Sequence, residues 1–131
     1  MTASPRYPLT MIVDDNELDS FVLKNVLTAN GFAAEAVLMP DGHSALDYLK
    51  ANASERLPRI IFLDIMMPHM DGFAFLEEIN KLSDPIKKNS KVIMLSTSES
   101  FKDLNRANQS KYVYKFLNKP LNKLVLDAIQ L

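Results

Sequence analysis

The chain has 131 residues and a mass of 14.8 kDa. This length favours one domain whose hydrophobic core is large enough to be stable without disulfide bonds or a structural metal. It contains no cysteine, which excludes disulfides, thiolate metal sites and a cysteine nucleophile. Its 15 basic and 16 acidic residues give a net charge of −1, which does not favour nucleic acid or anionic lipid as a partner. The apolar runs are too short to cross a bilayer, and Met1–Pro8 has no signal-peptide core, so we expect a cytoplasmic protein.

Short apolar runs rich in β-branched residues alternate with longer segments of helical period. The runs predict five strands, namely Leu9–Val13, Ala34–Leu38, Ile60–Leu63, Val92–Leu95 and Tyr112–Leu117. The third and fourth runs are apolar throughout, which is typical of parallel strands covered on both faces. The other segments predict five helices, namely Asn16–Asn30, Ser44–Ala53, Gly72–Leu82, Ser100–Gln109 and Asn122–Leu131.

Three details of this pattern add to the prediction. The first helix ends at Gly31, a natural left-handed terminator, and places one apolar stripe on its core face: Leu18, Phe21, Val22, Val26 and Ala29. Asn122 is available as the N-cap of the last helix. Ser83–Lys91 is polar and rich in lysine, and we expect a solvated loop there. The alternation of strand and helix predicts an α/β fold, with a parallel sheet covered by helices on both faces.

Polar side chains follow four of the predicted strands. Because ligands of open parallel sheets bind beyond the carboxyl ends of the strands, we expect these side chains to form one site: Asp14, Asp15, Asp64, Ser96 and Lys119. Three carboxylates at roughly 5 Å repel by about 3 kcal/mol per pair at an effective dielectric near 20, so they need a cation. Oxygen ligands without nearby His or Cys favour a hard ion, Mg²⁺, with Mn²⁺ or Ca²⁺ as substitutes. A lysine and a hydroxyl beside them indicate stabilisation of a phosphoryl group.

Four segments at these strand ends carry a family resemblance. They are Ile12–Glu17 with its acidic pair, Asp64–Gly72 (Asp-Ile-Met-Met-Pro-His-Met-Asp-Gly), Leu95–Thr97 and Lys119–Pro120. In this order they resemble the receiver domains of response regulators, the CheY-like family, over nearly the whole chain. The resemblance implies a (βα)5 doubly wound, flavodoxin-like sheet of strand order 2-1-3-4-5. It also implies that residues 1–8 are an N-terminal tail and that residues 9–131 form a single receiver domain without an output domain.

The resemblance further implies a role for each acidic residue. Asp64 would accept a phosphoryl group from the phosphohistidine of a sensor histidine kinase or a histidine phosphotransfer protein. Asp15, Asp64 and the backbone carbonyl of Met66 would bind Mg²⁺ directly, and Asp14 would act through water. The protein would then be a phosphorelay switch, not an enzyme apart from its own phosphotransfer and autodephosphorylation.

The remaining site residues would sense the phosphoryl group. Ser96 and Lys119 would contact its oxygens, and a cis peptide bond before Pro120 would direct Lys119 into the site. Phe116 matches the aromatic position that changes rotamer on activation, although it lacks the hydroxyl of the more usual tyrosine. The output would be a contact with an unidentified protein, made by a monomer or a phosphorylation-dependent homodimer.

Plainer interpretations remain open for most of these residues. Asp14 and Asp15 are able to cap the first helix, and Ser96 the helix that follows it. Lys119 fits a solvated side chain and Phe116 a core residue. Of the other residues near these motifs, the methionines are interpreted as packing residues and the histidines as surface residues: Met66, Met67, Met70, His43 and His69.

Two other functions compete with the phosphorelay switch. One is an aspartate-based phosphohydrolase of the haloacid dehalogenase type. Those enzymes carry an Asp-x-Asp motif, and in this sequence Met66 occupies the position of the second aspartate. The other is a degenerate receiver that serves only as a docking module. A nucleotide-binding loop is excluded, because the sequence has neither G-x-G-x-x-G nor a Walker motif.

Overall fold

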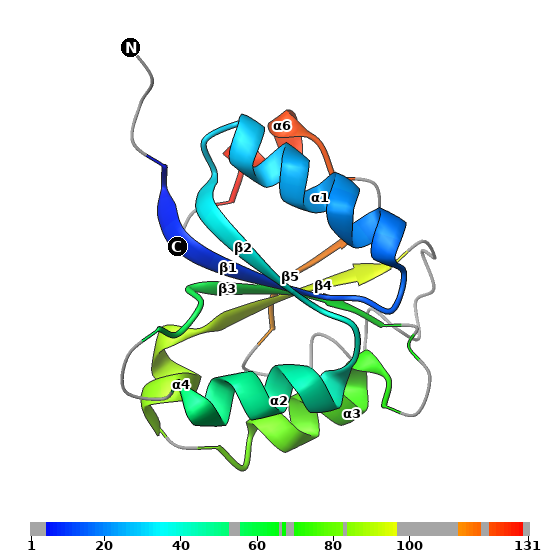
Figure 1. The fold of residues 1–131 in the computed structure, drawn as a ribbon, viewed down its shortest axis with the longest axis vertical. Helices are drawn as coiled ribbons and strands as arrows, with labels where there is room; N and C mark the ends of the chain where they lie inside the picture. The colour runs from blue at the N-terminus through cyan, green and yellow to red at the C-terminus, as the bar shows by residue number, and fades with distance from the viewer. Residues whose placement is uncertain are drawn as a thin grey trace.

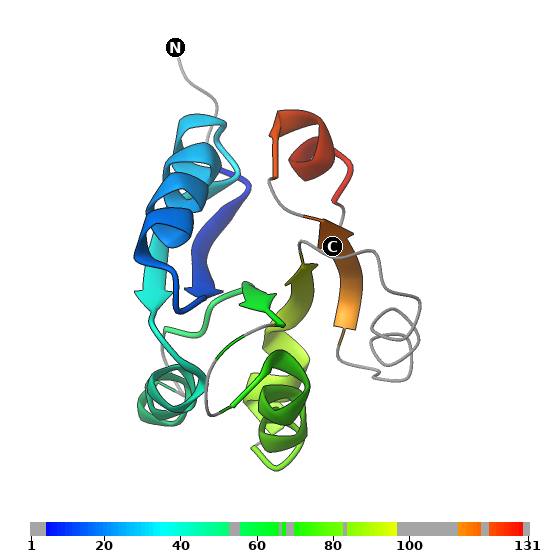
Figure 2. The same cartoon turned by 90° about the vertical axis from the view of Figure 1, so that its right-hand side faces the viewer.

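Five parallel strands form one sheet in the order β2-β1-β3-β4-β5, which confirms the predicted fold class and strand order. The computed structural model describes residues 5–52, 56–65, 67, 70–82, 84–96, 113–118 and 121–129, with backbone alone at 85, 96 and 118. The strands are β1 Tyr7–Val13, β2 Ala33–Met39, β3 Ile60–Asp64, β4 Lys91–Ser96 and β5 Val113–Asn118. Each strand overlaps its predicted range, and the twisted sheet is seen edge-on in Figure 2.

Helices cover both faces of the sheet (Figure 1). One face carries α1 Glu17–Ala29 and α6 Lys123–Asp127, and the other carries α2 Gly42–Ala51, α3 Gly72–Ile79 and α4 Asp84–Asn89. The predicted helix Ser100–Gln109 lies outside the described residues. None of the helices in the described part of the chain is long and apolar enough to cross a membrane.

The predicted helix ends agree with the structure at two places. The side chain of Asn122 accepts a hydrogen bond from the backbone N–H of Val125 at 3.0 Å, so Asn122 caps α6 as expected. Gly31 follows the end of α1 with φ +69°, the left-handed conformation that the sequence predicts there.

The central strands explain why the sheet is covered on both faces. In β3, Ile61 and Leu63 pack into the apolar cluster on the side of α2, α3 and α4, whereas Ile60 and Phe62 pack into the cluster beneath α1 and α6. These four side chains are fully buried, and β4 alternates between the two clusters in the same way. A strand that is apolar throughout is therefore buried on both faces, as predicted.

The prediction of a loop at Ser83–Lys91 is wrong, because α4 lies within this range. Its pattern is polar apart from Ile86, but that side chain is only 2% exposed and belongs to the cluster shared with α2 and α3. The buried hydroxyl of Ser90 then donates to the carbonyl oxygen of Pro58 at 2.6 Å. Tertiary packing at these two residues holds a helix that the local pattern does not predict.

The predicted core face of α1 is wrong for its first three residues. Leu18, Phe21 and Val22 are 70%, 57% and 50% exposed. The buried face of the helix carries other residues instead: Ser20, Leu23 and Leu27. Leucines occur on both sides of this helix, and the pair at 23 and 27 packs into the cluster beneath α1 and α6. Leu18, Phe21 and Val22 therefore form an exposed apolar surface, whereas Val26 of the predicted stripe is half-buried against this cluster.

Candidate functional site

Three carboxylates meet at the carboxyl ends of β1 and β3. The two strands are parallel neighbours with Val13 opposite Leu63, so Asp14 and Asp64 follow at the same level. The carboxylates of Asp14, Asp15 and Asp64 each offer one oxygen, and these oxygens lie within 4.8 Å of one another. The sheet thus brings together residues that are far apart in the sequence, as the strand order requires.

Burial and hydrogen bonds distinguish the three residues of this acidic cluster. Asp14 and Asp64 are buried, at 5% and 7% exposure, and Asp15 is exposed to solvent. The carboxylate of Asp14 accepts a hydrogen bond from the backbone N–H of Asn16 at 2.9 Å. The cluster is therefore closed on one side by protein and open to solvent at Asp15.

The plainer interpretation of the acidic pair as a helix cap is not supported. The N-cap of α1 is Asn16, whose side chain accepts from the backbone N–H of Asp19 at 3.0 Å. Asp14 belongs to the turn before the helix, and its own N–H donates to the carbonyl oxygen of Met39 in β2 at 3.1 Å. The cap of α1 is therefore Asn16, and the backbone of Asp14 is tied to β2 at the sheet edge.

Backbone contacts fix the end of β3. The N–H of Ile65 donates to Leu95 of β4 at 3.1 Å, and the N–H of Gly72 donates to Ile65 at 2.9 Å. Asp71 caps α3 by accepting from the backbone N–H of Ala74 at 2.9 Å. The start of α3 therefore lies against the backbone immediately after Asp64.

The other predicted site residues are placed only in part. Ser96 ends β4 with its backbone opposite Asn118 of β5, at the same edge of the sheet. Phe116 lies in β5 opposite Met94, half-buried against the cluster on the side of α2, α3 and α4, so its environment fits the core interpretation. Three site residues lie outside the described part of the chain: Met66, Lys119 and Pro120.

The methionines and histidines near the motifs behave as interpreted where the structure describes them. Met67 is buried in the cluster on the side of α2, α3 and α4, and Met70 packs against the same cluster. His43 is exposed. Met66 and His69 lie outside the described residues.

Asp41 follows β2 and caps α2. Its carboxylate accepts a hydrogen bond from the backbone N–H of Ser44 at 2.7 Å. This hydrogen bond lowers the pKa of Asp41 from its ordinary value of 3.8, because the amide stabilises the ionised form. Its effect on the protein is local to the start of α2.

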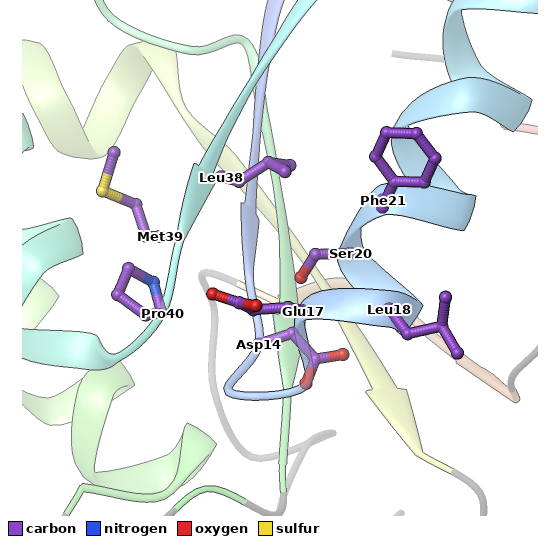
Figure 3. A pocket seen from close by; sticks show the side chains of 8 residues that line it. All are labelled: Asp14, Glu17, Leu18, Ser20, Phe21, Leu38, Met39 and Pro40. Atoms are coloured by element: carbon purple, nitrogen blue, oxygen red, sulfur yellow. The ribbon is translucent and has the colours of Figure 1, made fainter.

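A hollow between α1 and β2 opens next to the acidic cluster, and no sequence motif predicts it. Leu18, Ser20 and Phe21 from α1 line one side, Leu38–Pro40 line the other, and Asp14 also lines it (Figure 3). Ser20 is 3% exposed, and its hydroxyl has no hydrogen-bond partner among the described residues. Beside the carboxylates lies a surface suited to an apolar partner.

Comparisons with known proteins agree with this architecture. Residues 10–129 match the family described as the response regulator receiver domain. The probable methanogenesis regulatory protein FilR2 of Methanothrix harundinacea is 34% identical over 87% of this chain and 73% of its own length. The crystal structure of a two-component response regulator from Cytophaga hutchinsonii has a TM-score of 0.87 at 25% identity, covering 93% of this chain and 92% of that one.

A second solved structure is that of a metal-bound protein. The Mn²⁺-bound form of response regulator Rcp1 has a TM-score of 0.72 at 26% identity, covering 92% of this chain and 87% of that one. Other curated relatives are much longer, and this chain spans 15% of one and 24% of another. The family match nonetheless extends from β1 to the end of α6 and includes every strand of the sheet. On this match, and on a fold with the acidic cluster at its strand ends, the chain belongs to the response regulator receiver domain family.

Proposed function

We propose that the chain is a phosphoacceptor of two-component signalling, in which Asp64 receives a phosphoryl group with the help of Mg²⁺. The observation that carries this proposal is the acidic cluster, where two buried carboxylates and one exposed carboxylate lie within 4.8 Å at the strand ends. Such a group of like charges is costly unless a cation binds it.

The donor atoms of the cluster fit a hard divalent cation. Asp14, Asp15 and Asp64 offer carboxylate oxygens, which Mg²⁺ prefers, and Mn²⁺ is a common substitute. We propose that Asp15, Asp64 and the backbone carbonyl of Met66 hold the ion directly and that Asp14 acts through water. When bound, the cation supplies positive charge that offsets the carboxylates and the incoming phosphoryl oxygens.

The proposed reaction is an in-line transfer from phosphohistidine to Asp64. A carboxylate oxygen of Asp64 forms a bond to phosphorus as the phosphorus–nitrogen bond to the donor histidine breaks, and the histidine keeps the electron pair and takes up a proton. The result is an aspartyl phosphate. We propose that Lys119 and Ser96 bind its oxygens, that the peptide bond before Pro120 is cis, and that Phe116 responds to the occupied site.

The partner that donates the phosphoryl group must reach the same edge of the sheet. The exposed apolar face of α1, formed by Leu18, Phe21 and Val22, begins next to the acidic cluster and borders the hollow in Figure 3. An apolar surface at this place fits a protein donor, a histidine kinase or a histidine phosphotransfer protein. We propose that the donor covers this face while its phosphohistidine faces Asp64.

The first experiment is incubation with acetyl phosphate and Mg²⁺, followed by intact-mass measurement. We expect a gain of one phosphoryl group that is absent in Asp64→Asn and retained in Asp47→Asn, a matched change at an exposed aspartate of α2. A wild-type protein that takes up no phosphoryl group would favour the docking-module alternative. Rapid turnover of phosphate esters without an adduct would favour the phosphohydrolase alternative.

The second experiment separates the donor surface from the phosphoacceptor chemistry. Phe21 is 57% exposed, so covering its ring contributes about 1–2 kcal/mol to docking, or roughly 5- to 30-fold in affinity. We therefore expect Phe21→Ser to slow transfer from a phosphorylated protein donor by this factor and to leave phosphorylation by acetyl phosphate unchanged. Tyr114→Ser, at an exposed aromatic residue of β5, is the control. Equal transfer to wild type and Phe21→Ser would contradict the proposed docking face.

A further inference from the structure

Gly72, the first residue of α3, lies against the backbone that carries Asp64. A Cβ atom on residue 72 would lie 3.0 Å from the carbonyl oxygen of Asp64 and 3.0 Å from the Cα atom of Ile65. It would also lie 3.0 Å from the terminal methyl group of Met94. Separations of this size are tighter than nine in ten contacts of real Cβ atoms, so with any larger residue a neighbour must move by a few tenths of an ångström.

The requirement for glycine here is one of space and not of backbone conformation. Positive φ occurs at Gly31, whereas Gly72 has an ordinary helical backbone within α3. The N–H of Gly72 also donates to the carbonyl oxygen of Ile65 at 2.9 Å, which holds the helix start and the strand end together. A side chain at position 72 would therefore act on the strand end itself.

The contact joins the first turn of α3 to the end of β3. The helix is anchored by four buried side chains, at positions 73, 75, 76 and 79. On β3, the pairing with β1 ends at Leu63, and Asp64 pairs with Leu95 of β4. Because α3 is anchored by these buried side chains, we expect part of any displacement to fall on Asp64 and Ile65, which lie beyond the pairing with β1.

We infer that Gly72 is a positioning residue for Asp64, because its missing side chain lets the phosphoacceptor backbone seat against α3. The inference rests on the proposed function, since it concerns the distance between the Asp64 carboxylate and those of Asp14 and Asp15. A shift of a few tenths of an ångström at Asp64 changes the distances between the carboxylate oxygens of the cluster. These oxygens must bind one cation, and one of them must act as the nucleophile. Reactions of positioned groups lose about 100-fold for misplacement by roughly 1 Å, so a loss of about 3- to 10-fold is expected here.

The experiment compares Gly72→Ala with wild type in three measurements. These are the initial rate of phosphorylation by acetyl phosphate, the dissociation constant for Mg²⁺ alone, and the amide chemical shifts of Asp14, Asp64 and Ile65 without metal. We expect the rate and the Mg²⁺ affinity each to fall about 3- to 10-fold. We also expect the amide shifts of the three residues to change without metal, a readout that does not depend on phosphorylation.

Two control variants distinguish positioning from general destabilisation. Gly31→Ala places the same methyl group at the amino end of β2, where φ is +69° and no atom lies within 4 Å, so it strains the fold away from the site. We expect it to lower the melting temperature and to leave the rate and the metal affinity at wild-type values. Gly72→Ala with Met94→Leu removes the contact with the methionine methyl group, and we expect the defect to persist because the backbone contacts remain.

Each outcome decides a separate question. Gly72→Ala with wild-type Mg²⁺ affinity and amide shifts, Gly31→Ala with an equal loss of affinity, or full recovery in the double variant would overturn the inference. If wild type takes up no phosphoryl group, the proposed function fails. The Mg²⁺ affinity and the amide shifts of Gly72→Ala then still decide whether Gly72 positions Asp64.

Discussion

Replacing Asp14 by asparagine isolates the electrostatic cost of the acidic cluster. Asp14 and Asp64 are both buried, and their carboxylate oxygens lie within 4.8 Å. At that separation two unit charges repel by about 3 kcal/mol at an effective dielectric of 20. An asparagine at position 14 is nearly isosteric and still accepts the hydrogen bond from the N–H of Asn16, so the substitution removes charge with little change in packing.

The expected result depends on the presence of the cation. In EDTA, Asp14→Asn should be more stable than wild type by about 1–2 kcal/mol after solvent screening, or roughly 3–8 °C in melting temperature. Mg²⁺ at 100 times its dissociation constant stabilises a protein by about 2.7 kcal/mol, and the variant binds Mg²⁺ more weakly. Saturating the wild type with Mg²⁺ should therefore cancel or reverse the advantage of the variant.

The assay is thermal unfolding with and without Mg²⁺. Glu17→Gln serves as the matched control, since it removes one charge from the exposed first turn of α1 outside the cluster. The control should respond to Mg²⁺ as wild type does. If Asp14→Asn is less stable than wild type in EDTA, the reasoning is refuted. In that case a positive charge of the protein itself, with Lys119 as the predicted source, offsets the repulsion between the carboxylates.

Three further predictions concern stability. Asp41→Ala should cost about 1 kcal/mol at pH 7 in urea unfolding. The hydrogen bond from the Ser44 N–H lowers the pKa of Asp41, so the ionised cap stabilises the protein at a pH above the ordinary pKa of an aspartate. This stabilisation is lost as the pH falls below about 4. Asp41→Asn should lack that pH dependence. Ile86→Ala should cost about 2–4 kcal/mol in the same assay, and a cost below about 0.5 kcal/mol would contradict the burial of α4. Ser20→Ala should raise the melting temperature, because it removes a buried hydroxyl without a described partner; a lower value would contradict that environment.

The strands were predictable because their physical requirements are local. Ile60–Leu63 is apolar throughout, and a short apolar run between polar segments has few alternatives to a buried parallel strand. The six-residue α4 is different, since Ile86 is the buried anchor among its described side chains and its lysines resemble those of a solvated loop. Its formation depends on a packing site supplied by α2 and α3, which local periodicity does not represent.

The acidic cluster was predictable for a topological reason. Once Asp14 and Asp64 are placed directly after neighbouring parallel strands, the sheet brings them together without any further information. The contact of Gly72 was not predictable in the same way. It depends on how closely α3 approaches the end of β3, and a glycine in a sequence motif does not specify that distance.

The orientation of α1 shows how an exposed apolar face misleads a prediction from hydrophobic periodicity. The helical spacing of three apolar residues of α1 matches that of a core face, yet they are exposed: Leu18, Phe21 and Val22. Packing instead buries the opposite side of the helix through Leu23 and Leu27. Hydrophobic periodicity identifies a face that benefits from leaving water, but it does not say whether the cover comes from the same chain. On a helix that starts beside the acidic cluster, an apolar face left in water is consistent with a cover supplied by the phosphoryl donor. The residue pattern and the structure therefore disagree at the place where the proposed function needs a partner.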